Sequence, residues 1–216
     1  YKNAWLKIYD KPVVYFPYFF HPDPTVKRQS GFLMPSFKSS NNSGTSIQIP
    51  YYKVISDRKD LTLFPRVFFD NEILLQTEYR QANKESDLIL DFSVNRDEKN
   101  TKNHFFADLS SNKQNQVLNL HLESVSNDTY LKKNNITSPI INDNSSLHSY
   151  INYNSFNEDS SFDISFEVFE NLNKQKSDRY EYLFPNFNYE KYLYTDSNIN
   201  GDLTFNSRGF QKNYNT

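Results

Sequence analysis

Cysteine is absent from the 216 residues, and methionine and tryptophan occur once each. No disulfide can form within the chain, and this absence fits both a reducing compartment and an envelope protein without local bridges. No stretch approaches 18 consecutive apolar residues, so no transmembrane helix is predicted. The net charge is only −2 and the basic residues are scattered, which argues against a nucleic-acid partner.

Signatures of catalysis and metal binding are also missing. The chain has no Walker loop, no GxGxxG, no HExxH, no CxxC and no GxSxG. His21, His104, His121 and His148 are far apart, and none has a second ligand at helical or hairpin spacing, so we interpret them as solvated or lumen-facing rather than metal-bound. We predict no enzymatic activity, no catalytic residue, no metal site and no cofactor.

The chain is instead rich in strand-forming aromatic residues, with 16 tyrosines and 19 phenylalanines. From residue 30 onward, segments of strand length alternate with polar turns at a period near two. We predict eleven strands, near residues 30–38, 44–54, 59–69, 72–81, 86–96, 102–111, 115–126, 148–157, 160–171, 179–193 and 201–210.

In the clearest strands one face is apolar and the other polar. Residues 88–95, 118–123 and 162–168 all show this alternation. A soluble β-sandwich would pack its apolar faces together, whereas a membrane barrel would turn them to lipid and its polar faces to a wet lumen. The pattern alone leaves both architectures open.

The turns favour the barrel. If the first strand runs outward from the periplasm, the longest connection, 127–147, lies outside the cell, as long barrel loops do. The Asn/Ser-rich stretches 134–146 and 195–200 are expected to be turns or mobile loops without a packed element. Because the chain starts at Tyr1 without a signal peptide, we expect it to be a segment of a longer protein.

The most informative stretch is residues 12–52. An apolar run over residues 12–20 is followed by His21-Pro22-Asp23-Pro24, which breaks the strand because two prolines remove two backbone donors. A hairpin with one proline in each arm, Pro35 and Pro50, comes next. The residues that stand out, in order, are Val14-Tyr15, Pro17-Tyr18-Phe19, Ser30-Gly31-Phe32-Leu33, Pro35, Gly44, Pro50-Tyr51-Tyr52, Asp60-Leu61-Thr62-Leu63, Pro65 and Glu78-Tyr79-Arg80.

In order and spacing these residues resemble the LPS-assembly outer-membrane protein family LptD, also called the organic solvent tolerance protein. The resemblance is strong over roughly residues 8 to 80. Gln29 departs from it, since the family often has a basic residue there, and several relatives carry disulfides that this chain lacks. The resemblance implies an all-β fold: a segment of an antiparallel transmembrane β-barrel, preceded by the last strands of a periplasmic β-jellyroll.

The resemblance also implies a domain plan and a function. Residues 1–20 would end the periplasmic jellyroll, 21–29 would be a linker, and 30–216 would begin an outer-membrane barrel. The function would be insertion of lipopolysaccharide into the outer leaflet, with an LptE-like plug lipoprotein inside the barrel and an LptA-like bridge protein at the jellyroll edge as partners. The alternative from another class is a soluble or secreted β-sandwich that binds a glycan or a protein. An outer-membrane hydrolase barrel is weaker, because no nucleophile and base can be nominated.

Three sets of site residues follow from the resemblance. The lipid path along the jellyroll slot would contain Val13, Val14, Tyr15, Phe16, Tyr18 and Phe19. Lys27 and Arg28 are either snorkelling interfacial cations or contacts for a lipid phosphate. The lateral gate would contain Pro35 and Pro50.

The spacing of the two gate prolines suggests a register. A hairpin centred between Asn42 and Ser43 would place Pro35 directly opposite Pro50 and would put Phe37 on the face of Pro35. Opposite residues in an antiparallel ladder form either a hydrogen-bonded or a non-hydrogen-bonded pair. Because proline lacks the N–H donor, the barrel wall would lose backbone hydrogen bonds beside the linker in both cases.

Overall fold

The computed structural model describes residues 2–8, 10–18, 28–40, 44–69, 72–96, 100–174, 178–193 and 203–214. The chain divides into two compact units, Tyr1–Ser30 and Gly31–Thr216. Within the described residues, no helix has the length and apolar character needed to cross a membrane.

The first unit contains one antiparallel hairpin, formed by β1 (Lys2–Ile8) and β2 (Lys11–Tyr18). Asp10 makes the turn with a φ of 60°, a left-handed conformation that Asp tolerates better than most residues. Trp5 lies opposite Tyr15 with the ring centroids 4.9 Å apart. The apolar run that begins at residue 12 is therefore a strand, as its sequence predicts.

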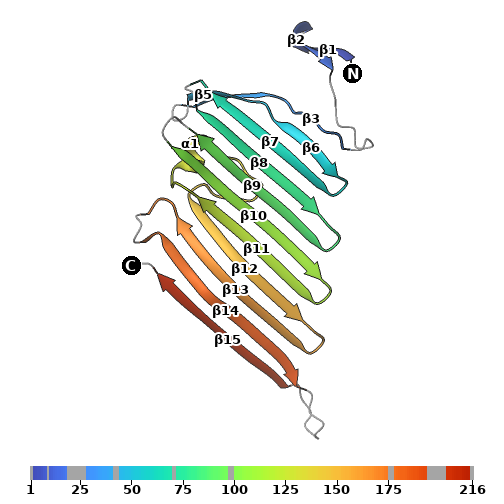
Figure 1. The fold of residues 1–216 in the computed structure, drawn as a ribbon. Coiled ribbons are helices and arrows are strands. Elements are labelled where there is room, and N and C mark those ends of the chain that lie inside the picture. The colour runs from blue at the N-terminus through green and yellow to red at the C-terminus, as the bar shows by residue number, and fades with distance from the viewer. Residues whose placement is uncertain are drawn as a thin grey trace. The chain divides into compact units, whose positions relative to one another are not determined.

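The second unit is one antiparallel sheet of thirteen strands that follow each other in nearly sequential order (Figure 1). Its strands are β3 (Gly31–Phe32), β4 (Ser36–Ser40), β5 (Gly44–Gln48), β6 (Tyr51–Ser56), β7 (Lys59–Phe68), β8 (Ile73–Ala82), β9 (Ser86–Arg96), β10 (Thr101–Lys113), β11 (Gln116–Val125), β12 (Ser146–Phe156), β13 (Ser160–Asn171), β14 (Tyr180–Leu193) and β15 (Leu203–Tyr214). A single short helix, α1 (Tyr130–Asn134), lies in the connection between β11 and β12.

These strands confirm the predicted all-β antiparallel fold. Each of the eleven predicted segments contains a strand, and nine of them are single strands. The first two are each divided, into β3 and β4 and into β5 and β6, at the residues around Pro35 and Pro50. The breaks occur where proline removes a donor from the ladder.

Tight turns gather at one end of the sheet. The connections 57–58, 83–85, 114–115 and 157–159 are two or three residues long and all join strands at this end. The connection 126–145 leaves from the opposite end. This asymmetry is typical of barrels that have short turns on one side of a membrane and longer loops on the other.

The two faces of the sheet are inverted relative to a soluble protein. In β9, Asp91 and Ser93 are fully buried, whereas Phe92 and Val94 are about 40% exposed (40% and 41%). Directly paired residues share a face, and the registers put Asp91, Asn119 and Asp163 on this polar face. The same registers put Leu90, Leu120 and Ile164 on the apolar face, so the predicted division between the two faces is confirmed.

The polar face is buried because the connection 126–145 folds back onto it. Tyr130 and Leu131 of α1, with Ile136 and Ile140 after it, are at most 6% exposed. They form one apolar cluster with the strand residues Phe68, Leu74, Phe106 and Leu147 and with Leu172, which directly follows β13. Residues 135–145 form turns and bends, as one of the two expectations had it, but the stretch is packed against the sheet by Ile136 and Ile140 within it and by Tyr130 and Leu131 just before it.

Candidate functional site

The first candidate site is the interruption shared by the first two strands of the sheet. Residues 33–35 separate β3 from β4, and residues 49–50 separate β5 from β6. β7 is continuous and pairs with both halves of the second strand, in one register from Ser46 opposite Phe68 to Val54 opposite Asp60. The interruption is therefore confined to the first strands and ends at β7.

The register differs from the predicted one. Ser36 lies opposite Gln48 and Phe37 opposite Ile47, so the hairpin centres on Asn42 and the two prolines are not directly opposite. Between β3 and β6 the register differs by one further residue, and Phe32 lies opposite Tyr51 with the ring centroids 5.1 Å apart. The one-residue error also reverses Phe37, which shares the exposed apolar face with Ile47.

Missing donors leave two rungs with one hydrogen bond each. Leu33 donates its N–H to the Pro50 carbonyl at 2.8 Å, and Pro50 has no N–H to return. In the next seam Ile49 donates to the Pro65 carbonyl at 3.3 Å, and Pro65 likewise has none to return. Ser36 follows Pro35, and its backbone hydrogen-bonding groups point toward the second strand. The backbone of Pro35 therefore points toward the outer edge of the first strand, and that edge is where the N–H donor is missing.

Pro65 is a member of this site that the sequence analysis did not assign. It lies on β7 opposite Ile49 on one side and Leu75 on the other. The signal was present in the constant spacing of Pro35, Pro50 and Pro65, which brings three prolines to one level of three adjacent strands.

The predicted lipid-path residues are only partly described. Tyr15 is exposed, and its hydroxyl donates to Asn3 Oδ1 at 2.5 Å. The side chains of Val13, Val14, Phe16 and Tyr18, and all of Phe19 and Lys27, lie outside the described residues. Arg28 is described and exposed. The assignments of the slot and of a phosphate contact at Lys27 and Arg28 stay predictions.

A second candidate site lies on the polar face, under α1. Ser93 Oγ is 2.6 Å from His104 Nδ1 and 2.6 Å from the Tyr130 hydroxyl, and His104 Nε2 is 3.3 Å from Asp91 Oδ1. Burial raises the pKa of the Tyr130 phenol, so the hydroxyl stays neutral at physiological pH. Although Ser93, His104 and Asp91 form a connected chain, they are at most 1% exposed, and no substrate can reach Ser93. The cluster therefore attaches α1 to β9 and β10.

Further polar contacts hold the same connection against the sheet. Gln76 Nε2 donates both to Asp91 and, at 3.0 Å, to the Thr137 carbonyl. Asn95 Nδ2 donates to Asn134 Oδ1 at 2.7 Å, and Arg66 Nη1 donates to the Asn134 carbonyl at 2.5 Å. These contacts reach from β7 to β9, so the connection spans the strands beside the interruption.

The other two described histidines also lie on the polar face, each against a carboxylate. His121 Nδ1 is 2.8 Å from Asp108 Oδ2 and its Nε2 is 3.0 Å from Glu123 Oε1. His148 Nε2 is 3.0 Å from Glu167 Oε2. Within the described ranges, no three His, Asp or Glu side chains are grouped so as to hold a metal ion.

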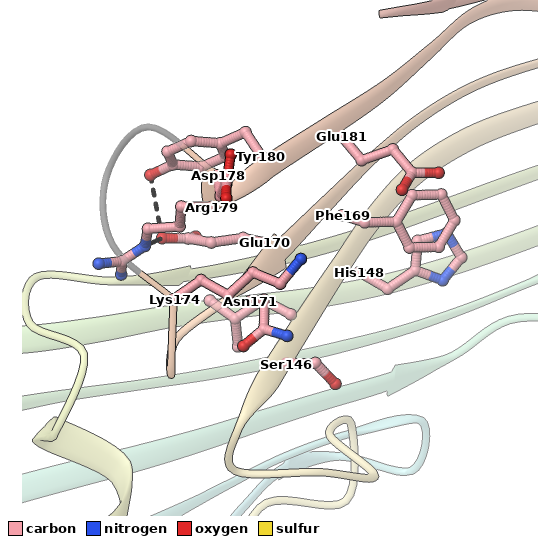
Figure 2. Close-up of a pocket in the computed structure, with 11 residues that line it drawn as sticks. Ser146, His148, Phe169, Glu170, Asn171, Lys174, Asp178, Arg179, Tyr180 and Glu181 are labelled. Carbon is pink, nitrogen blue, oxygen red and sulfur yellow. Dashed lines mark hydrogen bonds and ion pairs between the residues drawn. The ribbon is translucent and has the colours of Figure 1, made fainter. Parts of the chain in front are cut away.

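A pocket of about 510 Å³ opens where β12 and β14 begin and β13 ends (Figure 2). Two of its charged groups bind each other: Arg179 Nε is 2.6 Å from Glu170 Oε1, to which Tyr180 also donates at 2.9 Å. Arg179 Nη1 is also 3.5 Å from Asp128, in the connection that carries α1. The pocket thus contributes to fixing that connection and offers no uncompensated charge at Arg179.

Comparison with known proteins agrees with this geometry. The profile of the family described as LptD protein matches residues 1–197. The chain belongs to the LptD family. Family membership supports the barrel and jellyroll parts of the predicted fold.

Three LptD relatives show how much of the chain aligns. The LPS-assembly protein LptD of Pseudomonas aeruginosa is 39% identical over 88 residues, which cover 41% of this chain and 9% of that protein. The LptD of Pseudoalteromonas translucida is 43% identical over 83 residues, 38% of this chain and 11% of that protein. The LptD of Idiomarina loihiensis is 32% identical over 135 residues, 60% of this chain and 18% of that protein. The chain thus covers only a small part of the length of its curated relatives.

Proposed function

We propose that the chain is part of an outer-membrane machine that inserts lipopolysaccharide into the outer leaflet. Residues 1–20 end the periplasmic jellyroll, 21–29 link it to the barrel, and 30–216 form the first part of the barrel wall. Transport proceeds by passage of the lipid rather than by catalysis. The relatives named LPS-assembly protein LptD support the substrate.

The observation that carries the proposal is the break beside Pro35 and Pro50. In a bilayer no water replaces a missing backbone hydrogen bond. The first two strands of the sheet are therefore held together less firmly at this break than a continuous ladder would hold them. The ladders from β7 to β13 have no register shift, and the next shifts occur only in the two seams of β14, so this break is limited to the first strands of the sheet. We infer that the first strands part at this level and release the lipid sideways.

The exposed apolar face supports a membrane location. Phe32, Met34, Phe37 and Phe69 are all more than 70% exposed (71–76%). Moving such a side chain out of water is worth roughly 1.5–3 kcal/mol, and lipid provides that environment along a whole barrel wall. No apolar layer covers this face among the described residues, which disfavours the alternative of a soluble β-sandwich.

The lipid reaches the gate along the hairpin of the first unit. Val13 and Tyr15 are alternate residues of β2, and Trp5 and Tyr15 already form an aromatic contact. We propose that this strand lines the slot and that Lys27 and Arg28 contact the lipid phosphates at its exit. An LptE-like plug lipoprotein would bind the inner face, and an LptA-like bridge protein would extend the jellyroll by adding strands.

The double variant Pro35→Ala and Pro50→Ala in the full-length protein tests the gate. Alanine at residue 50 restores the donor to the Leu33 carbonyl, and a net hydrogen bond contributes roughly 0.5–1.5 kcal/mol, more in lipid. Folding should be intact and delivery of lipopolysaccharide to the cell surface reduced. Pro139→Ala, in the exposed part of the 126–145 connection, is the matched control. Unchanged delivery in a stably folded double variant would remove the gate assignment and leave the fold in place.

A further inference from the structure

Arg66 is a buried cation that has no carboxylate partner among the residues that the structure describes. Its side chain lies on the polar face of β7, and the residue is 3% exposed. Its two hydrogen bonds go to neutral oxygens, the Asn134 carbonyl at 2.5 Å and Gln48 Oε1 at 3.0 Å, and Nε has no partner. No carboxylate among the described residues forms an ion pair with it. Burying an unpaired charge is costly, and an ionisable group kept at such a cost in a membrane wall is usually functional.

A second cation lies beside it. Lys38 on β4 is opposite Ser46, and Ser46 is opposite Phe68 two residues along β7 from Arg66, so both cations are on the same face. One strand, β5, separates the two cations on this face. The nearby carboxylate Glu72 is already bound by Lys133 at 2.9 Å. Positive charge is therefore concentrated on the inner side of the first three strands, next to the proline interruption.

We propose that Arg66 and Lys38 form a binding site for a phosphate group of a lipid that moves along the inner wall. A guanidinium matches phosphate oxygens with two parallel N–H bonds, and a lysine adds a point charge. The choice of a lipid phosphate as the ligand rests on the proposed function, to which this site adds a specific contact. It is distinct from Lys27 and Arg28, which precede the first strand.

The carbonyl oxygen of Asn134 occupies the place of the phosphate in this structure. A neutral carbonyl is a weaker partner for a guanidinium than an anion is. Because the phosphate and Asn134 compete for Arg66, binding of the lipid loosens the end of α1, and docking of α1 weakens lipid binding by the same factor. Arrival of lipid beside the interrupted strands thus opens the inner face above them.

The test uses the full-length protein with its partners in membranes, carrying a photo-crosslinking residue at Ser36. This position lies on the inner face opposite Gln48, which accepts the Arg66 hydrogen bond. The probes are lipopolysaccharide with its phosphates and the same lipid after phosphatase treatment. Capture of the phosphorylated lipid should exceed that of the treated lipid by about tenfold or more, the range expected for a charged hydrogen bond.

Substitutions separate the site from general charge effects. Arg66→Gln and Lys38→Gln should remove the preference, and Arg66→Lys should retain part of it. Arg58→Gln, in the exposed turn at the opposite end of the sheet, removes the same charge and should change nothing. Exchange at the Ile136 amide, which donates to the Leu131 carbonyl, should rise when the phosphorylated lipid is added.

Four results would overturn the proposal. The first is equal capture of both lipids by the unsubstituted protein, a result that does not depend on the folding of any variant. Absence of capture at Ser36 with normal surface delivery would reject this site and leave the proposed function standing, whereas absence of delivery by the unsubstituted protein would reject both. Inorganic phosphate is tested alone by phosphorus NMR, and its binding without phosphate-dependent lipid capture would reject a lipid as the source.

Discussion

Replacing Leu131 with alanine should release α1 from the polar face of the sheet. Leu131 is fully buried among Phe68, Leu74, Phe106 and Leu147. Truncating a buried leucine costs about 2–5 kcal/mol, because the transferred methyl groups are lost and a cavity is left behind. Even the lower figure corresponds to about a 30-fold shift between docked and undocked states, at about 1.4 kcal/mol for each factor of ten.

Hydrogen exchange measures this shift directly. The Lys133 amide donates to the Thr129 carbonyl at 2.8 Å and the Ile136 amide to the Leu131 carbonyl at 3.0 Å, so both report on the docked connection. Exchange at these amides should accelerate about 30-fold or more in Leu131→Ala, while the ladder between β9 and β10 keeps its protection. Lys132→Ala on the exposed side of α1 is the control and should change exchange by less than about threefold, as a surface substitution does. Equal exchange in the two variants would refute the view that apolar packing attaches this connection.

Two further predictions concern β2, on the proposed lipid path, and the end of the connection 126–145. Photo-crosslinkers at Val13, Val14, Tyr15 and Phe16 should capture lipopolysaccharide at alternate positions only, because successive strand residues point to opposite faces; equal capture at odd and even positions would argue against a structured slot. Hydrogen bonds from the Ser145 hydroxyl and backbone N–H lower the pKa of Asp143. A lowered pKa contributes stability above the unfolded value that is lost as pH falls through the folded value. Exchange at the Ser145 amide, taken relative to the intrinsic exchange rate at each pH, should therefore rise in acid, and Asp143→Asn should abolish that pH dependence.

The strands could be predicted from the sequence because their signal is local. Over 86–96 and 160–171 the alternation of apolar and polar side chains sets both the length of each strand and the face of each residue. The register of the first hairpin could not be predicted in the same way. It depends on the conformation of the turn that ends at Gly44, whose φ is 72°, and a shift of one residue reverses every face.

The contacts on the polar face of the sheet join residues that are distant in the sequence. Ser93, His104 and Tyr130 meet only because the connection folds back onto the sheet, and Arg66 meets Asn134 across 68 residues of sequence. The Asn/Ser-rich composition of 134–146 is typical of a mobile loop. The apolar residues Tyr130, Leu131, Ile136 and Ile140 within and beside it were the available signal that part of this stretch is packed.

The central claim is that the apolar face of the sheet contacts lipid while the polar face lines an aqueous interior. Spin labels placed singly at Leu90, Leu120 and Ile164, and at Asp91, Asn119 and Asp163, in the full-length protein in membranes test it most directly. Relaxation by oxygen, which partitions into lipid, should dominate at the first three positions. At Asp91, Asn119 and Asp163, oxygen should have little effect, and a water-soluble relaxant should act wherever α1 leaves the label accessible. Access of the water-soluble reagent to all six positions would contradict the membrane-wall account.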